Sequence, residues 1–309
     1  MSEISEAMSL DAHDVYNAYV LLCMAGDDDA PLGVDYVPAG FDRNTQINVV
    51  PWQLVRAALG QFYGNLLRMC DSDSVELVHH ARIGWRRLRS SCRLLRRFHD
   101  LPEPPPTGPL LLLLEQLRAL RECHVARYDI LPHMASDSQA WHAFAEALDT
   151  EARTRLKVVR VLLEDPAVGQ TLCKHVVWLG QLRDHARASP SQPQKAQAIA
   201  TWATHQVEKI HRAFERAQSQ CQDAQTQHQA RIWAKRLRYA VEDFEGVLPQ
   251  TAIKWHKAAA KAQAEFGAQR DLQTTANLAK RHGAPQLADK WAQALFRKVR
   301  PRHSNRRSV

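Results

Sequence analysis

Apolar residues recur every three or four positions along most of the chain, the spacing that places them on one face of an α-helix. In the first half this pattern predicts helices at about 50–70, 75–99, 109–128, 139–164 and 167–187. In the second half it predicts helices at about 194–222, 225–247, 251–268, 270–282 and 285–299, and one more helix precedes both halves at about 4–25. Prolines and the Ser-Pro-Ser-Gln-Pro stretch at 189–193 mark breaks between helices. We expect an all-α protein.

The two series of helices share a motif. The pattern H-x-x-R-I-x-x-R-R-L-R at 79–89 recurs as H-x-x-R-I-x-x-K-R-L-R at 228–238, so every matched pair is 149 residues apart. The dipeptides Arg-Glu at 121–122 and Arg-Asp at 270–271 keep the same offset. A repeat of this length indicates duplication of a helical unit, and we expect the two copies to pack face to face about a pseudo-twofold axis.

Charge within the repeat is one-sided. Between Glu76 and Asp100 there are seven arginines and no acidic residue. At about 100° per residue, six of these arginines and His79 fall within one arc of about 100°, while apolar residues occupy the opposite side. Like charges at i,i+4 repel, so this arc predicts a counter-charge, supplied either by acids of a neighbouring helix or by an external polyanion. Arg is also the side chain that binds phosphate with a planar fork.

The net charge of +8 supports the external polyanion. Residues 1–42 hold nine acids and no Lys or Arg, so the remainder carries 41 basic against 24 acidic residues, a net charge of +17. Opposite charge also suggests that segment 1–42 folds back onto the basic surface. The 309 residues suffice for about two ordinary domains. The longest aliphatic run, 110–114, is too short for a membrane helix and the N-terminus is acidic, so we expect a cytoplasmic protein without membrane contact.

Other chemistry finds less support in the sequence. The six cysteines are widely spaced, which is typical of reduced buried thiols, and neither a metal-ligand motif nor a cofactor motif is present. Nucleic acid is an alternative partner, but Trp85, Phe98 and Trp233 fall outside the basic arcs and offer no stacking surface for bases. A phosphohydrolase would need carboxylate-bound Mg²⁺ or an activated nucleophile, and a histidine phosphorelay fits poorly beside six arginines. We expect no enzymatic activity.

At these residues the sequence resembles the CHAD family, the conserved histidine α-helical domain, over about residues 50–300. The resemblance rests on the motifs at 79–89, 228–239, 121–122 and 266–271. It implies two four-helix bundles with pseudo-twofold symmetry around a basic groove or pore that binds inorganic polyphosphate, and an association with polyphosphate granules. The corresponding division of the chain is an acidic N-terminal helix and arm at 1–49, a first bundle at 50–189, a second bundle at 190–300 and a basic tail at 301–309.

The polyphosphate-binding set has three origins. The resemblance implies His79, Arg82, Arg86, Arg89, His228, Arg231, Lys235 and Arg238. The helical wheel adds Arg93, and the stripe of lysines on the following helix adds Lys257 and Lys261, although a solvated helix face also accounts for that stripe. The two motif histidines are expected at the rim, where a nearby anion favours protonated imidazole.

Overall fold

The computed structural model describes residues 12–24, 35–134, 138–188, 196–289 and 291. In this part of the chain the regular elements are all helical, and the expectation of an all-α protein is confirmed. The α-helices are α1 Ala12–Met24, α2 Val50–Asp71, α3 Val75–Leu95, α4 Leu111–His124, α5 Gln139–Leu163, α6 Pro166–Ala188, α7 Ala196–Ser219, α8 Ala224–Phe244 and α9 Gln250–Arg281. Among these described residues, no helix is both long and apolar enough to cross a membrane.

Helix ends follow local signals in the sequence. Helix α2 begins with Pro51 in its first turn, and α6 begins at Pro166, where the missing proline N–H costs no hydrogen bond. Before α8, the Asp223 carboxylate accepts a hydrogen bond from the Thr226 backbone N–H, and the Thr226 hydroxyl lies near the Asp223 backbone N–H to complete a capping box. Prolines were among the signals for the predicted breaks, whereas the capping box at Asp223 was not used.

One predicted break is wrong. The sequence pattern separates helices 251–268 and 270–282, but α9 runs without interruption through 32 residues. Gly267 lies within α9, and a glycine in a helix costs only about 1 kcal/mol relative to alanine, which packing on both sides offsets. In the first copy the helix does change its hydrogen-bond geometry at the corresponding stretch. There α4 is followed by a π-helix at Val125–Ile130 and a 3₁₀ turn at Leu131–Met134.

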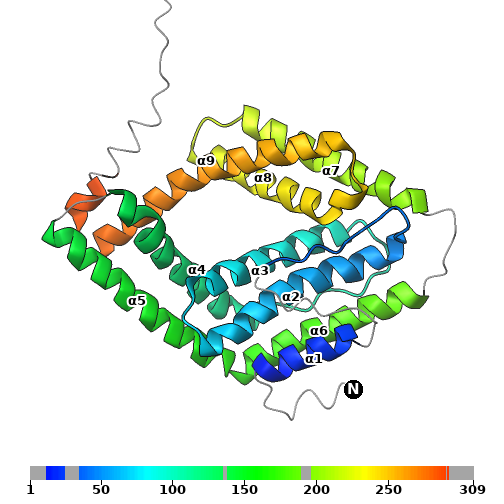
Figure 1. Ribbon diagram of the computed structural model, residues 1–309, viewed down its shortest axis with the longest axis horizontal. Helices are drawn as coiled ribbons and strands as arrows, with labels where there is room; N and C mark the ends of the chain where they lie inside the picture. Colours follow the sequence, from blue (N-terminus) through cyan, green and yellow to red (C-terminus); the bar gives the residue numbers. More distant parts are fainter. Residues whose placement is uncertain (1–11, 25–34, 135–137, 189–195, 290, 292–309) are drawn as a thin grey trace, which may run out of the picture.

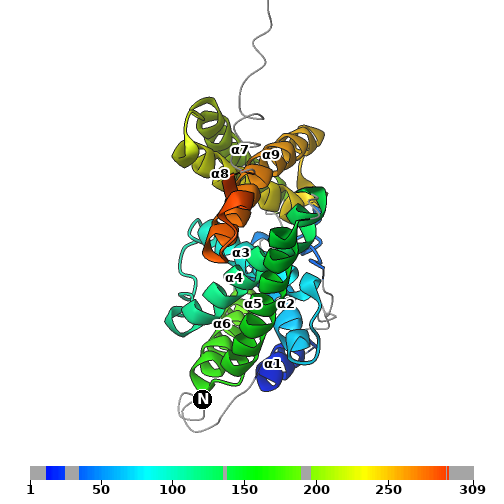
Figure 2. The same ribbon diagram turned by 90° about the vertical axis from the view of Figure 1, so that its left-hand side faces the viewer.

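The helices form two groups on either side of α3 (Figures 1 and 2). Helices α2, α6 and α1 lie on one side, and α7, α8 and α9 lie on the other. Helix α9 then extends past α8 to contact α4 and the π-helix. Helices α3 and α8 start and end at positions that differ by 149 residues, so the sequence repeat coincides with a repeat of these helices. The pseudo-twofold relation and the count of four helices per bundle stay predictions.

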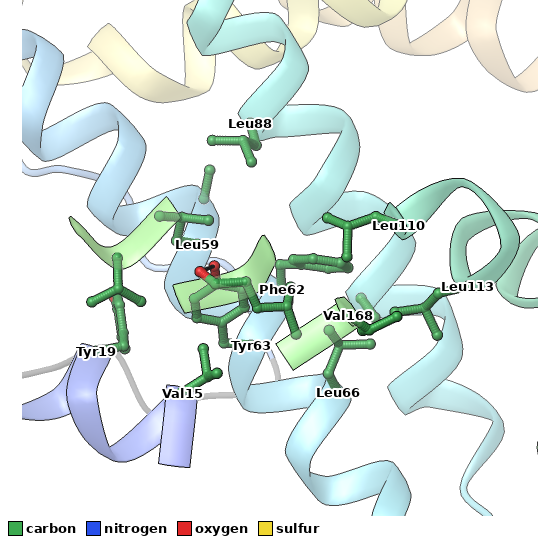
Figure 3. Packing of buried hydrophobic residues seen from close by; sticks show 14 of the residues in the cluster. Val15, Tyr19, Leu59, Phe62, Tyr63, Leu66, Leu88, Leu110, Leu113 and Val168 are labelled. Atoms are coloured by element: carbon green, nitrogen blue, oxygen red, sulfur yellow. Dashed lines mark hydrogen bonds between the residues drawn. The ribbon is translucent and has the colours of Figure 1, made fainter. Parts of the chain in front are cut away.

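The largest apolar core joins α1 to α6, with Phe62, Tyr63 and Leu59 of α2 near its centre (Figure 3). A second core lies among α7, α8 and α9 around Phe214 and Leu237. Two further clusters combine residues from both predicted bundles, one around Phe244 and one around Trp291. Apolar packing thus continues across the predicted boundary between the two bundles at residues 189 and 190. That boundary stays a prediction.

The N-terminal acidic segment is partly described. Residues 1–11 and 25–34 lie outside the described residues, as does the basic tail 301–309, so their predicted roles stay predictions. Helix α1 packs on α2 and α6, and its Tyr19 hydroxyl donates a hydrogen bond to the Arg56 carbonyl at 2.9 Å. Residues from 35 onward cross to α8, where Phe41 stacks on Phe244 with ring centroids 5.1 Å apart. Five cysteines within the described residues are free thiols.

Candidate anion-binding cavity

A cavity of about 800 Å³ lies among α3, α4, α8 and α9. Its lining is strongly cationic, because ten lining side chains are Arg or Lys and only two are carboxylates. The cations are Arg82, Arg86, Arg89, Arg93, Arg118, Arg121, Arg231, Lys235, Arg236 and Arg270, and the carboxylates are Glu122 and Asp271. His79 and His228 complete the charged or titratable lining.

Helix α3 presents its arginines to the cavity because its other face is fixed against α2. Ala81, Leu88 and Gly84 are buried on that other face. A Cβ atom at Gly84 would lie 2.6 Å from the Phe62 backbone nitrogen, so α2 and α3 pack in close backbone contact there. The side chains of Arg82, Arg86, Arg89 and Arg93, at steps of three or four residues, therefore point away from α2 and toward the cavity.

Helix α8 supplies the matching residues of the second copy. His228, Arg231 and Lys235 line the cavity at positions 149 residues after His79, Arg82 and Arg86. Ala230, Ala234 and Leu237 are fully buried on the opposite face of α8. The repeated motif thus brings its equivalent side chains to one cavity, and we call Arg82, Arg86, Arg231 and Lys235 the central cluster.

Eight of the residues predicted from the sequence line the cavity, and three do not. Arg238, Lys257 and Lys261 lie outside the lining. Arg238 is directed to Glu242, whose Oε1 accepts a hydrogen bond from the Arg238 Nε at 2.9 Å. Lys257 and Lys261 are exposed on α9, whose cavity face is formed instead by residues such as Gly267, Arg270 and Asp271. Whether any of these side chains binds an anion stays a prediction.

Four cationic lining residues were missing from the predicted set. Arg118 and Arg121 come from α4, Arg236 from α8 and Arg270 from α9. The shared offset of Arg121 and Arg270 was a usable signal, since equivalent residues of two facing copies approach the same space. Arg236 had no such signal, because its first-copy counterpart Arg87 is buried at the junction of α3 and α8.

The cations of the cavity differ in whether the protein already neutralises them. Arg118 forms ion pairs with Glu115 and Glu122, and Arg121 pairs with Asp129 at 3.1 Å. By contrast, no carboxylate of the described residues lies within 4.0 Å of the charged nitrogens of the central cluster. The central cluster therefore has no ion-pair partner among the described residues, and Asp271 and Glu122 offset its positive charge only in part.

Burial, followed by the nearby positive charges, lowers the pKa values of Lys235, Arg82 and Arg231. The pKa of Lys235 is lowered to about 6. Burial is the largest cause of this shift, and the positive charges of Arg86, Arg231 and Arg270 add to it. Burial, followed by the charge of Arg86, lowers the pKa of Arg82 to about 9. The site therefore disfavours its own positive charges when no anion is bound.

The histidines respond to the same field. Burial lowers the pKa of His79 to about 4, with the charge of Arg121 as the next cause. The pKa of the exposed His228 is also lowered, chiefly by desolvation and then by Arg270. Both surroundings thus favour the neutral imidazole, and an anion close by would favour protonation.

The chain matches the family model of the CHAD domain over residues 53–280. The chain belongs to the CHAD domain family. The matched residues extend from α2 to the end of α9 and include every residue that lines the cavity. A comparison with curated proteins gives no match.

A solved CHAD domain has the same fold. The crystal structure of the CHAD domain from the plant Ricinus communis superposes with a TM-score of 0.71 and 21% sequence identity. The similarity covers 86% of this chain and 92% of the plant chain. At this level of identity the likeness establishes the fold alone, so the chemistry of the cavity has to be argued from the residues of this chain.

Two carboxylates of this CHAD domain border the cavity. Glu122 is held by Arg118, with its Oε1 accepting a hydrogen bond at 2.6 Å. Burial raises the pKa of Asp271, although Arg231 and Arg121 oppose that effect. Within the described residues, no three His, Cys, Asp or Glu side chains come together as a metal-binding group. What the arrangement offers chemically is a cationic enclosure with many N–H donors and few acceptors.

Proposed function

We propose that this CHAD domain binds inorganic polyphosphate in the cationic cavity and catalyses no reaction on it. The observation that carries the proposal is the central cluster, in which Lys235 lies among three arginines with no carboxylate of the described residues in ion-pair distance. A buried charge without a counter-charge costs several kcal/mol. A bound polyanion would supply the missing counter-charge for all four side chains together.

A linear phosphate polymer fits the shape and lining of the site. The cations come from α3, α4, α8 and α9, so they face the open cavity of about 800 Å³ from several sides. A chain with one negative charge per phosphate can approach donors on every side, and each guanidinium can bind two phosphate oxygens at once. Binding of this kind would also hold the protein at polyphosphate granules in the cytoplasm.

The lining favours polyphosphate over nucleic acid. Among the described residues, Tyr239 is the Phe, Tyr or Trp side chain that borders the cavity, and its ring lies against the guanidinium of Arg87 at 4.5 Å from the ring centroid. The ring is thus already used in a cation–π contact and is not free to stack on a base. Polyphosphate has no bases, so its binding does not require an aromatic ring on which to stack.

The test is a binding titration with long-chain polyphosphate at several salt concentrations. We expect tight binding. The logarithm of the association constant should fall linearly with the logarithm of the salt concentration, because each neutralised phosphate releases a counterion. Duplex DNA or RNA at equal phosphate concentration should fail to displace the polyphosphate. Displacement by nucleic acid, or no binding at physiological salt, would contradict the proposal.

A pair of triple variants separates the cavity from general surface charge. The variant Arg82→Gln, Arg86→Gln, Arg231→Gln removes three charges of the central cluster and should weaken binding at least about a hundredfold. The control Lys157→Gln, Lys174→Gln, Lys209→Gln removes three charges from exposed positions of α5, α6 and α7 outside the cavity and should retain most of the affinity. Equal losses in the two variants would show that net charge, not the cavity, determines binding.

A further inference from the structure

Two contacts between α3 and α8 correspond through the 149-residue offset but differ in charge. In one of them, Arg87 of α3 forms an ion pair with Glu242 of α8. The residue 149 positions after Arg87 is Arg236, and the residue 149 positions before Glu242 is Arg93. The counterpart of a buried ion pair is therefore a pair of arginines.

Arg93 and Arg236 do lie near each other at the cavity. Both line it, and the charge of Arg93 is the main cause, after burial, that lowers the pKa of Arg236. The Nε atom of Arg236 is buried and has no hydrogen-bond partner in the described structure. Its guanidinium lies over the Trp233 ring at 4.4 Å from the centroid, which fixes the side chain in place.

Carboxylates do not compensate this pair. Burial, then Arg89 and Arg96, lower the pKa of Arg93, with Cys92 opposing them last; burial, then Arg93 and Arg89, lower the pKa of Arg236. Among the described residues no acid is within ion-pair distance of Arg93 or Arg236. The position that Glu242 fills beside Arg87 is thus occupied by a second positive charge beside Arg236.

The same asymmetry continues toward the end of α3. Arg96 follows Arg93 by three residues and is exposed, while its second-copy counterpart is Glu245. Arg89 lines the cavity, while its counterpart Arg238 is bound to Glu242. Unpaired cations therefore extend beyond the central cluster along α3, and the equivalent turns of α8 are neutralised.

We propose that Arg93 and Arg236 form a second phosphate subsite, which holds the part of a long polyphosphate chain that leaves the central cluster along α3. A phosphate group there takes the place that the Glu242 carboxylate has beside Arg87, and it accepts hydrogen bonds from both guanidinium groups. This inference rests on the proposed function, since it assigns a direction and a second contact to the same ligand.

The decisive variant is Arg93→Glu, which recreates at Arg236 the charge pair that Glu242 makes with Arg87. We expect the ligand-free variant to fold with an unchanged or higher thermal midpoint, because Arg236 gains a partner. Its affinity for long-chain polyphosphate should fall about tenfold, and its salt slope should become smaller by about one. Its affinity for tripolyphosphate, which is short enough to remain at the central cluster, should change less than about threefold.

Two further variants control this experiment. Lys209→Glu makes the same change of net charge at an exposed position outside the cavity and should change long-chain affinity less than about twofold. Arg93→Gln removes the cation without adding an acid and should weaken long-chain binding about fivefold. Equal losses for the two ligand lengths, or equal losses in Arg93→Glu and Lys209→Glu, would overturn the subsite while leaving the proposed function intact. Failure of the unmodified protein to bind either ligand would overturn both proposals.

Discussion

Arg87 of α3 and Asp243 of α8 form an ion pair of 3.3 Å in which both side chains are almost fully buried. The guanidinium also lies 3.6 Å from the centroid of the Tyr36 ring, and the Tyr36 hydroxyl donates a hydrogen bond to Asp243 at 2.5 Å. Three separate parts of the chain therefore meet at one buried charge. This contact fixes α3 against α8 at the side of the cavity.

Replacing Arg87 by methionine should destabilise the protein strongly. The Asp243 carboxylate would be left buried without its cation, and breaking a buried pair in this way costs about 3–5 kcal/mol. Chemical denaturation measures the change in the free energy of unfolding. Arg89→Met, at an exposed position two residues away, is the control and should change that free energy by less than about 0.5 kcal/mol. Similar values for the two variants would contradict the structural role of Arg87.

Polyphosphate binding should strengthen as the pH is lowered. Without a ligand the pKa of Lys235 is about 6, below its ordinary value of 10.5, and a bound polyanion would raise it. Between the ligand-free and the ligand-bound pKa, binding takes up a proton, so affinity should rise by up to about tenfold per pH unit from pH 8 toward pH 6 before levelling off below about 6. His79, with a pKa of about 4, would add a smaller rise below that.

Calorimetry in buffers of different ionisation enthalpy measures the proton uptake directly. In the variant Lys235→Arg the charge is retained but does not titrate in this range, so the change between pH 8 and pH 6 should disappear. An unmodified protein that binds equally well at pH 6 and pH 8 would show that Lys235 is not in contact with the ligand.

Replacing Lys235 by methionine should stabilise the protein when no anion is bound. The folded-state pKa of Lys235 lies below its unfolded-state value, so the unfolded chain binds more protons and stability rises with pH between about 6 and 10.5. Methionine removes that penalty, and we expect a gain of several kcal/mol near pH 6 that becomes small near pH 10. Thermal denaturation across this pH range tests the expectation. A loss of stability at pH 6 would show that the amine is already compensated.

Two glycine substitutions should have opposite effects. Alanine at Gly84 would place its Cβ atom 2.6 Å from the Phe62 backbone nitrogen, and α2 and α3 would have to separate, at a cost of about 1–3 kcal/mol. Alanine at Gly267 meets no atom within 4 Å and should stabilise α9 by about 0.5–1 kcal/mol. If the two substitutions changed the free energy of unfolding in the same direction, the packing of Gly84 and Gly267 would be contradicted.

Most of the fold could be predicted from the sequence, because the signals for it are local. Apolar periodicity defined the helices, and the fixed offset of 149 residues correctly aligned α3 with α8. The predicted break near residue 269 was wrong because a glycine weakens a helix only slightly, and the contacts of α9 with α4 and α8 keep it continuous.

The cavity could be predicted only in part, because a helical wheel describes one helix at a time. It placed the five lining residues of α3 on the correct face, and the repeated motif together with the family resemblance supplied His228, Arg231 and Lys235 of α8. It could not show that Glu242 of α8 withdraws Arg238 from the cavity, nor that α4 and α9 add Arg121 and Arg270. Those outcomes depend on contacts between helices that are far apart in the sequence.

The uninterrupted course of α9 limits how the cavity can open. At 1.5 Å per residue its 32 residues form a rod of about 48 Å, which contacts α8 near one end and the π-helix after α4 near the other. Separating the walls of the cavity would require bending this rod and breaking its hydrogen bonds. The width of the cavity is therefore set by the backbone, and a ligand has to adapt its own conformation to it. A thin and freely rotating polymer does this far more readily than a stiff double helix.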